Sequence, residues 1–345
     1  MHPLEKVTII GSGNWGSAIA KIVGTNTACH TDLFEPTVRQ WVYEEILDNK
    51  KLTDIINEQH ENIKYLKGVK LPHNVVAVSD LVEACKDASL LVFVLPHQFI
   101  HGVCEKMKGY LRPQARAISL IKGLEITAEG TRLFSEEISH ILNIPCAALS
   151  GANIANEVAL EQFSESTIGC QDIEVDGHIF KNLFNTAYFR VNVIQDHVGV
   201  QLCGALKNVV AVGAGFSDGL GYGSNTKAAI IRLGLLEMRK FGQTFFGDAV
   251  QTETFFESCG AADLITTCNG GRNRKVAEAF VLTKKPIEQL EEELLNGQKL
   301  QGTLTAREVH QFLSARNMQH EFPLFSTVYR IAYEGLSPEN IIIDI

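Results

Sequence analysis

The sequence predicts an α/β fold in which a doubly wound parallel sheet comes first and an all-helical domain follows. Three observations lead to this expectation. Short apolar runs alternate with helical patterns through the first half of the chain, a glycine-rich turn joins the first run to the first helix, and strand signals nearly vanish after Gln195. The 345 residues, 45% of them hydrophobic, suffice for two cores. We therefore expect two domains, residues 1–194 and 195–345.

The first strand and the turn after it carry the most specific signal. Val7–Ile10 is an apolar run, and the pattern G-x-G-x-x-G follows at once, before a helical stretch. The first glycine would make a tight turn, the second would let a pyrophosphate approach the backbone, and the third would let the helix lie close to the sheet. The helix N-terminus then offers free N–H groups to phosphate, although an ordinary glycine turn is the alternative. The order predicts a Rossmann-type dinucleotide-binding domain, with contacts from Gly11, Ser12, Gly13, Asn14, Trp15 and Gly16.

The other strands of the sheet are predicted from short apolar runs. The run Leu90–Leu95 is apolar on both faces, which is typical of a central parallel strand. The charged segment Asp48–Lys70 looks like a solvated excursion. The remaining expected strands are Gln40–Tyr43, Val75–Val78, Ala115–Ser119, Ala147–Ser150 and Phe189–Ile194, and the helices between them are Asp80–Ala88, Gln98–Tyr110 and Thr131–Leu142.

The second half reads as a series of helices. Val198–Phe216 is apolar enough to be mistaken for a membrane span, but Gln201, Lys207 and Asn208 interrupt it. A lysine near the centre of a bilayer is costly, so we expect a buried helix and no stable membrane insertion. The expected helices are Val198–Val212, Asn225–Phe246, Thr252–Ala261, Asn273–Leu282, Ile287–Asn296, Thr305–Arg316 and Leu324–Tyr333.

Three loops at the carboxyl ends of predicted strands face the expected ligand crevice. The second strand ends at Tyr43, and Glu44 and Glu45 follow. An acidic side chain there can bind ribose hydroxyls and repel a 2′-phosphate, so NAD is favoured over NADP, while a solvated strand end is the alternative. Phe99 after the fourth strand would pack on the cofactor or begin the core face of the next helix. Lys122 after the fifth strand points at the crevice or at solvent.

Lys207 lies in an almost wholly apolar helix beside Asn208. Burial disfavours the charged form of a lysine, which prepares its amine for proton transfer near neutral pH. The alternative is a lysine whose stem is buried while its amine reaches water at the edge of the helix. Asp263, in an apolar setting before two threonines, would pair with Lys207 or cap a helix.

The segment Asn269–Lys275 places two glycines before a helix start that includes Asn273 and three bases, Arg272, Arg274 and Lys275. Helices favour acidic side chains in the first turn, so three bases there point to an external anion. The planar guanidinium of Arg272 suits phosphate. A solvated basic face is the alternative.

Composition excludes several classes of protein. A net charge of −9 argues against nucleic acid as a partner. The eight cysteines lack a C-x-x-C pair and read as reduced thiols of a cytoplasmic protein. The first strand begins too early to leave room for a leader peptide, which also favours the cytoplasm. No His/Cys cluster has metal-ligand spacing, so we expect no metal site.

Seven segments together resemble NAD-dependent glycerol-3-phosphate dehydrogenase of the cytosolic, eukaryotic type. The resemblance covers nearly the whole chain, from Val7 to about Glu334. Tyr43 stands where the family has phenylalanine, and Ser150 stands where it has methionine. The segments are GSGNWGSAIAKIV, FVLPHQF, SLIKG, LSGANIANEVA, CGALKNVVAVGAGFSDGLGYGSNTKAA, DLITTCNGGRNRKVAEAF and LNGQKLQG.

The resemblance implies specific roles for individual residues. It makes Lys207 the catalytic lysine, adds Lys122 and Asp263 to the catalytic set, and gives both lysines positions near the substrate. The substrate contacts that it implies or that lie beside the catalytic lysine are Lys122, Asn208, Thr267, Arg272 and Asn273. The implied cofactor contacts outside the glycine turn are Tyr43, Phe99, Lys122, Ala155, Arg272, Lys299 and Gln301.

The same resemblance implies the reaction and the assembly. Dihydroxyacetone phosphate and NADH would give sn-glycerol 3-phosphate and NAD in a reversible hydride transfer, catalysed by a homodimer. Two alternatives remain. One is another NAD-dependent reductase of the same two-domain plan that acts on a different phosphorylated or carboxylated substrate. The other is a catalytically weak relative that binds NAD(H) and regulates a membrane protein.

Overall fold

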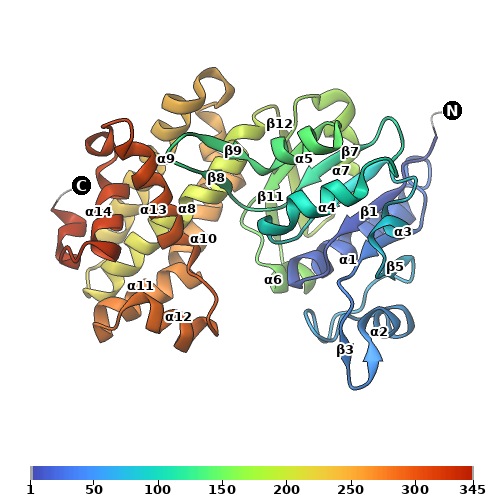
Figure 1. Cartoon of the computed structure of the whole chain (residues 1–345), viewed down its shortest axis with the longest axis horizontal. Coiled ribbons are helices and arrows are strands. Elements are labelled where there is room, and N and C mark those ends of the chain that lie inside the picture. The colour runs from blue at the N-terminus through green and yellow to red at the C-terminus, as the bar shows by residue number, and fades with distance from the viewer. Residues whose placement is uncertain (1–2, 344–345) are drawn as a thin grey trace. The chain divides into compact units, whose positions relative to one another are not determined.

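The computed structural model describes residues 3–343, and contacts divide the chain into two units. The first unit consists of residues 1–121 and 133–197, and the second of residues 122–132 and 198–345. The second unit therefore includes a segment, 122–132, that the sequence pattern assigns to the first domain. The two units are described separately below (Figure 1).

The first unit is built on an eight-stranded sheet. Its strand order is β12-β11-β10-β7-β6-β1-β2-β5, and every neighbouring pair is parallel except β10 and β11. This arrangement confirms a mostly parallel, doubly wound sheet. The strands are β1 (Val7–Ile10), β2 (Val38–Trp41), β5 (Val75–Val78), β6 (Leu90–Phe93), β7 (Arg116–Ser119), β10 (Cys146–Ser150), β11 (Ser164–Gly169) and β12 (Phe189–Ile194).

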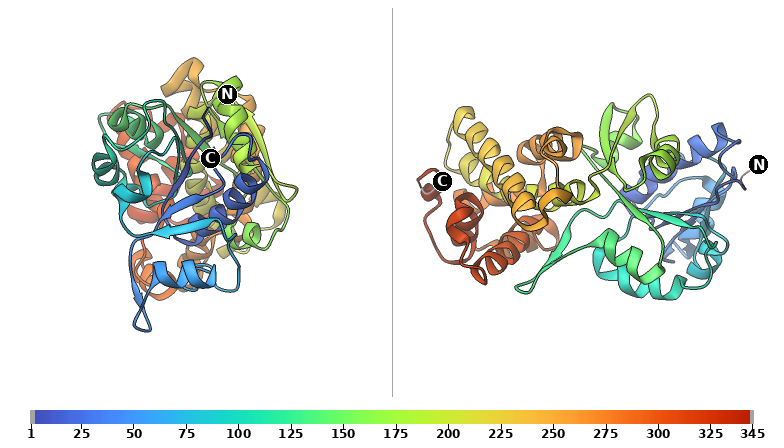
Figure 2. Two further views of the ribbon diagram at one scale, coloured as in Figure 1. Left: turned by 90° about the vertical axis from the view of Figure 1, so that its right-hand side faces the viewer. Right: turned by 90° about the horizontal axis from the view of Figure 1, so that it is seen from above.

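Helices cover both faces of this sheet, as Figures 1 and 2 show. Alternate residues of one strand enter different cores: Val7 and Ile9 join the core under α1 and α7, whereas Ile10 joins the core under α4 and α5. This sorting follows from the two-residue period of a strand. The helices are α1 (Asn14–Cys29), α2 (Leu52–Gln59), α3 (Leu81–Cys85), α4 (Ile100–Met107), α5 (Phe134–Leu142), α6 (Ala155–Ala159) and α7 (His178–Phe184).

Two sequence predictions in this unit are wrong. The segment Asp48–Lys70 is not a solvated excursion, because it contains strand β4 (Lys50–Lys51), which pairs with β3 (Ile46–Leu47) just before the segment, and then helix α2. Leu52, Ile55 and Ile56 of α2 are buried, and the surrounding charges hid this helical spacing. The helix expected from Thr131 begins at Phe134 instead.

Residues Thr131–Leu133 form strand β9, which pairs with β8 (Leu124–Ile126) in a separate hairpin. A turn that joins the backbones of Thr127 and Gly130 closes this hairpin. The sequence pattern assigns residues 122–132 to the first domain, whereas the hairpin packs with the second unit.

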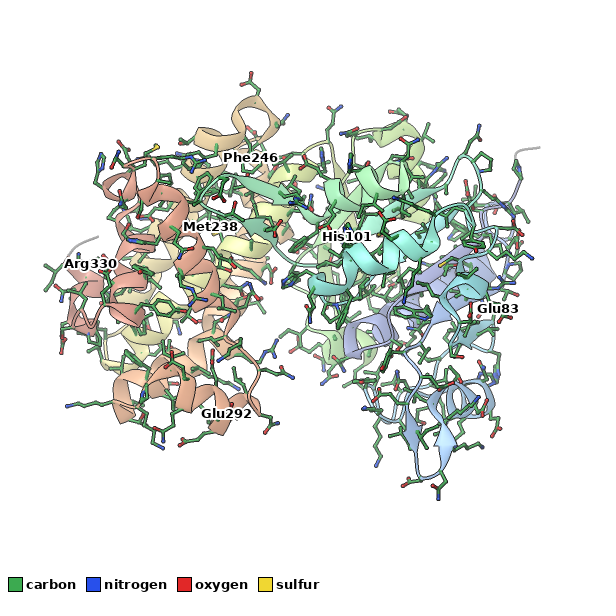
Figure 3. All side chains as sticks on the ribbon, viewed as in Figure 1. Glu83, His101, Met238, Phe246, Glu292 and Arg330 are labelled. Atoms are coloured by element: carbon green, nitrogen blue, oxygen red, sulfur yellow. The ribbon has the colours of Figure 1, made fainter. Side chains whose placement is uncertain are left out.

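The second unit is otherwise helical and surrounds α8 (His197–Gly219), whose residues are almost all buried. Figure 3 shows side chains across the fold; Met238 is buried, whereas Glu292 and Arg330 are exposed. The predicted helix Thr252–Ala261 is replaced by a 3-10 turn, Glu253–Phe256, and a π turn, Ser258–Ala262. The other helices are α9 (Ser224–Phe246), α10 (Asp263–Gly270), α11 (Arg272–Thr283), α12 (Ile287–Leu295), α13 (Gln301–Ser314) and α14 (Pro323–Tyr333).

Candidate functional site

Lys207 is a buried lysine in the middle of α8, with only 5% of its surface exposed. The pKa of its amine is lowered from 10.5 to about 8, chiefly by burial and also by the positive charge of Lys122. The carboxylate of Asp263 opposes both effects. The amine is thus close to half protonated just above neutral pH, where a proton donor and acceptor is most effective.

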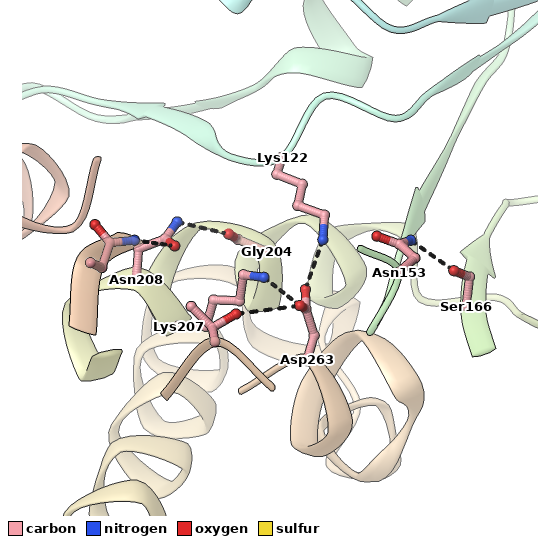
Figure 4. Close-up of polar contacts among 9 residues, drawn as sticks. Lys122, Asn153, Ser166, Gly204, Lys207, Asn208 and Asp263 are labelled. Carbon is pink, nitrogen blue, oxygen red and sulfur yellow. Dashed lines mark hydrogen bonds and ion pairs between the residues drawn. The ribbon is translucent and has the colours of Figure 1, made fainter. Parts of the chain in front are cut away.

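Asp263 joins two lysines from distant parts of the sequence, as Figure 4 shows. Its Oδ1 lies 2.5 Å from Nζ of Lys207, and its Oδ2 lies 3.1 Å from Nζ of Lys122. The carboxylate is 4% exposed, and Thr267 Oγ1 donates to Oδ1 at 3.5 Å. One buried negative charge therefore faces two ammonium groups, and this cluster attracts an anionic ligand.

The backbone before Asp263 is tightly constrained. Asp263 is the first residue of α10 and follows the π turn Ser258–Ala262. A Cβ atom at Gly260 in this turn would lie 2.3 Å from the carbonyl oxygen of Phe255, so only glycine fits. The close packing fixes where α10 begins and thereby places the carboxylate.

A chain of amide hydrogen bonds joins three helices beside this cluster. The N–H of Gly302 donates to Oδ1 of Asn273 at 2.8 Å, and Nδ2 of Asn273 donates to Oδ1 of Asn208 at 2.9 Å. Nδ2 of Asn208 then donates to the carbonyl of Gly204 at 3.3 Å. Because the first donor is a backbone N–H, the direction of the chain and the orientation of both side-chain amides are fixed.

Arg272 begins α11 and is exposed, and its Nη1 donates to Oε1 of Gln298 at 2.9 Å. Gly271 precedes it, and in residues 3–343 no side chain caps this helix. A free helix start beside a guanidinium is suited to binding phosphate. Gln298 was not singled out in the sequence, because nothing local relates it to Arg272.

One of the three bases of this turn, Arg274, has acidic partners within the protein. Nη1 of Arg274 lies 2.9 Å from Asp218 and 2.9 Å from Glu278, so its charge is balanced within the protein. Lys227 also pairs with Asp218, at 2.8 Å. The positive charge at the start of α11 is therefore partly balanced by Asp218 at the end of α8 and by Glu278 in the next turn of α11.

The segment between α12 and α13 is held by Glu291, a buried residue that the sequence analysis missed. Its Oε1 accepts the N–H of Leu300 at 2.8 Å, and its Oε2 lies 2.8 Å from Nζ of Lys299. The side chain of Lys299 is 63% exposed. Nε2 of Gln301 donates to Oγ1 of Thr305 at 3.2 Å. Both expected cofactor residues therefore have accessible polar groups in this segment.

In the first unit, the glycine turn has the geometry expected of a phosphate-binding loop. Gly11 has a φ of +120°, and a Cβ there would lie 2.3 Å from the carbonyl oxygen of Val94. A Cβ at Gly16 would lie 2.6 Å from the carbonyl oxygen of Gly11. At Gly13 a Cβ would meet no described atom within 4 Å, and no side chain in residues 3–343 caps α1. This open backbone and free helix start fit a pyrophosphate.

Polar side chains from the misread segment support this turn. Nδ2 of the buried Asn62 donates to the carbonyl of Ser12 at 2.8 Å and to Oγ of Ser17 at 2.9 Å. Asn14 donates to the carbonyl of Tyr65 at 2.7 Å and to Oδ1 of Asn156 at 2.8 Å. The charged context of Asn62 gave no sign of this role.

The other expected cofactor residues of the first unit differ in exposure. Tyr43 and Phe99 are 73% and 54% exposed, so Phe99 is not a core residue of α4. Ala155 begins α6 and is partly buried. Trp15 packs edge-on to Phe189 with ring centroids 6.2 Å apart, so its ring serves the core. Nδ2 of Asn153, also in this unit, donates to Oγ of Ser166 at 2.8 Å (Figure 4).

The two acidic residues after the second strand have partners within the protein. Glu44 Oε2 accepts the hydroxyl of Thr53 at 2.6 Å, and Glu45 Oε1 accepts the hydroxyl of Tyr65 at 2.7 Å. Glu45 also pairs with Lys64. These contacts give both carboxylates a structural role, and discrimination between NAD and NADP by them remains a prediction.

Comparison with known proteins agrees with this geometry. The N-terminal model of the NAD-dependent glycerol-3-phosphate dehydrogenases matches residues 6–176, and the C-terminal model matches residues 196–343. The cytoplasmic NAD(+) glycerol-3-phosphate dehydrogenase of Homo sapiens is 59% identical over 96% of this chain and 94% of its own length. The chain belongs to the NAD-dependent glycerol-3-phosphate dehydrogenase family.

Solved structures of glycerol-3-phosphate dehydrogenases share the whole fold of this family member. The enzyme of Saccharomyces cerevisiae is 48% identical, with a TM-score of 0.95 and 98% of each chain covered. The Plasmodium falciparum enzyme is 45% identical, with a TM-score of 0.94, 99% of this chain and 95% of its own chain covered. The fold class expected from the sequence is thus confirmed for both parts of this dehydrogenase.

Two further features bear on the chemistry of this dehydrogenase. Within residues 3–343 no group of three or more His, Cys, Asp or Glu side chains is placed to hold a metal ion. The same residues contain one helix, α8, that is long and apolar enough to cross a membrane, but 94% of its apolar window is buried inside the protein. Burial of this kind marks α8 as a core helix.

Proposed function

We propose that this dehydrogenase catalyses the reversible reduction of dihydroxyacetone phosphate to sn-glycerol 3-phosphate, with Lys207 as the general acid. The observation that carries the proposal is the buried Lys207 amine, whose pKa is about 8 and which lies 2.5 Å from Asp263. When bound, NADH supplies the hydride, and the Gly11–Gly16 turn with the free start of α1 would hold its pyrophosphate. The glycines and the open backbone at Gly13 fit that group.

The ammonium form of Lys207 supplies the proton for the reduction. Negative charge develops on the carbonyl oxygen as the carbonyl carbon is reduced, and the Lys207 ammonium stabilises this charge and donates a proton to it. The neutral amine takes the proton back in the reverse reaction. Asp263 maintains the protonated form, and Lys122 adds positive potential beside the same carboxylate.

The phosphate of the substrate would be held away from the reacting carbon. Arg272 at the start of α11 and the buried amide of Asn273 would supply donors. Asn208, which bonds to Asn273, and Thr267, which bonds to Asp263, would add substrate contacts beside Lys207. Binding energy at an unreacting phosphate positions the carbonyl and so contributes to the rate.

The wider assignments extend the same proposal. Residues 1–194 would bind the cofactor and residues 195–345 the substrate, with contacts to NADH added from Arg272, Lys299 and Gln301. We propose a homodimer, as the resemblance implies. We also propose a cytoplasmic location, because the human, rat and mouse relatives are named cytoplasmic.

The test is a turnover assay that follows NADH absorbance with dihydroxyacetone phosphate. We expect turnover by the wild-type protein, loss of most of kcat in Lys207→Ala, and NADH binding near the wild-type value in that variant. Unphosphorylated dihydroxyacetone is the matched control and should react far more slowly. NADH binding without turnover would refute the proposal and favour the regulatory alternative, and turnover of another phosphorylated or carboxylated carbonyl alone would favour the other reductase.

A further inference from the structure

Lys122 begins the segment 122–132, which forms a short β-hairpin and packs with the helical unit. Gly123 follows it with a φ of +128°, a conformation in which glycine is favoured, and strands β8 and β9 then run to a turn at residues 127–130. Strand β8 packs against α13. An isolated two-stranded hairpin is at best marginally stable in water, so the position of Lys122 depends on what holds this hairpin.

Arg316, just after α13, holds the tip of the hairpin. Its Nη1 donates to the carbonyl of Ala128 at 2.9 Å, and its Nη2 donates to the carbonyl of Glu129 at 3.2 Å. Nη1 also donates to the carbonyl of Phe312 at 2.9 Å, and the guanidinium carbon lies 3.7 Å from the centre of the Phe312 ring. The planar fork of an arginine is suited to such a set of bonds.

The aromatic ring on which Arg316 lies is buried. Phe312 is 3% exposed and packs against Phe241 and Phe245 of α9. Arg316 therefore joins the hairpin tip to the aromatic core of the helical unit. The only cross-strand ion pair of the hairpin among residues 122–132, between Arg132 and Glu125, is largely exposed and contributes little.

We propose that Arg316 is a positioning residue for the reaction: by clamping the hairpin tip to α13, it keeps the Lys122 amine at Asp263. This inference rests on the proposed function and adds a residue that touches neither the substrate nor the cofactor. Released from Arg316, the hairpin loses its anchor beside α13, the backbone at its base shifts with it, and the Lys122 amine leaves the carboxylate.

The pH dependence of the rate reports this displacement. The charged and titratable groups that face Lys207 are Lys122 from the hairpin, and Asp263 and Cys268 from α10. Lys122 lowers the pKa of Lys207 from its position beside Asp263. When Lys122 leaves, the pKa of Lys207 therefore rises, and the pH midpoint of the reduction rises with it. A loss of general stability alone leaves this midpoint unchanged.

The experiment compares Arg316→Ala, Lys122→Met and the double variant, with the full chain in each. In Arg316→Ala we expect kcat/KM for dihydroxyacetone phosphate at pH 7 to fall roughly 10- to 100-fold, the loss typical of a catalytic group displaced by about 1 Å. The pH midpoint of the reduction should move upward in this variant, and we expect the same in Lys122→Met. The double variant should match Lys122→Met, because both changes act on one amine. Arg316→Lys should restore part of the loss.

Arg307→Ala is the matched control. Arg307 lies on α13, the helix that Arg316 follows, and its guanidinium also lies over an aromatic ring, Tyr333, at 5.4 Å, but it does not hold the hairpin tip. In Arg307→Ala we expect the pH midpoint of the reduction and kcat/KM to remain at wild-type values. A wild-type midpoint in Arg316→Ala, or effects of Arg316→Ala and Lys122→Met that multiply in the double variant, would refute the positioning role.

A second measurement does not depend on turnover. An amine-reactive succinimidyl ester, with modified sites mapped by mass spectrometry, reports how accessible Lys122 is. The Lys122 side chain is 30% exposed. Its labelling should become several-fold faster in Arg316→Ala, less so in Arg316→Lys, and should not change in Arg307→Ala. Unchanged labelling overturns the inference even if the proposed function holds. Faster labelling in a protein without turnover supports the clamp and refutes only the proposed function.

Discussion

Asp263→Asn is the substitution that most directly tests the charge balance of the site. The carboxylate contacts both Lys207 and Lys122, and an amide of the same size keeps the packing while it removes the negative charge. Lys207 then retains the burial and the like charge that lower its pKa and loses the partner that raises it. We therefore expect the pKa of Lys207 to fall further.

The size of this fall follows from the burial of the pair. Removal of one partner from a buried ion pair costs about 3–5 kcal/mol. Since about 1.4 kcal/mol corresponds to one pKa unit, the pKa of Lys207 should drop by roughly two to four units. From about 8 in the wild type, it reaches about 6 or less. At pH 7 roughly a tenth or less of the Lys207 amines then carry the proton, and reduction slows at least about tenfold.

The assay is kcat for reduction of dihydroxyacetone phosphate between pH 5.5 and 9, with NADH binding measured by fluorescence as the control. In the wild type, reduction requires the ammonium form, so kcat should fall as pH rises through about 8. In Asp263→Asn the same fall should occur at least about two pH units lower, with NADH affinity nearly unchanged. A variant midpoint that stays near 8, or moves upward, would show that Asp263 does not keep the proton on Lys207.

Three other predictions concern separate parts of the protein. Arg272→Ala should raise KM for dihydroxyacetone phosphate roughly 10- to 100-fold, as expected for a lost charged hydrogen bond, and leave KM for dihydroxyacetone unchanged; equal effects on both substrates would contradict a phosphate contact. Gly11→Ala should lower Tm because its Cβ would lie 2.3 Å from the Val94 carbonyl, whereas Gly13→Ala should keep Tm and weaken NADH binding. Equal Tm values for the two glycine variants would contradict that distinction. Glu237 accepts the N–H groups of Leu324 and Phe325 at the start of α14, and burial raises its pKa from 4.5 to about 7. Because the folded-state pKa is above the unfolded value, Glu237 contributes stability at low pH that is lost, by on the order of 3 kcal/mol, as pH rises from about 4.5 to about 7; Glu237→Gln should remove this dependence of the urea midpoint, and an unchanged slope would contradict it.

The strands of the sheet were predictable because their signal is local. Leu90–Phe93 is apolar on both faces and forms the central strand β6, as its pattern indicates. The misread segment after β2 shows the limit of this reasoning. Charged and polar residues surround its buried Leu52, Ile55 and Ile56. The prediction therefore followed the charged composition of the segment and missed the helical spacing of these apolar residues.

The pairing of Lys207 with Asp263 was also predictable, because a buried charge requires a partner. The partners of Lys122, Arg272 and Arg274 were not. Lys122 reaches Asp263 across 141 positions of sequence through a hairpin that no local pattern announces. Asp218 neutralises Arg274 across 56 positions, and Gln298 reaches Arg272 across 26. Such pairs depend on the packing of whole helices.

Residues 122–132 pack with the helical unit although the residues before and after them belong to the first unit, and this has a consequence for the gene. The polypeptide passes between the two units three times, after residues 121, 132 and 197, so no single cut separates them. A fragment that begins at Val198 lacks the Lys122 amine and strand β8, which packs against α13. Recombination that exchanges substrate preference between such enzymes must therefore transfer two pieces of coding sequence together, one of them only eleven codons long.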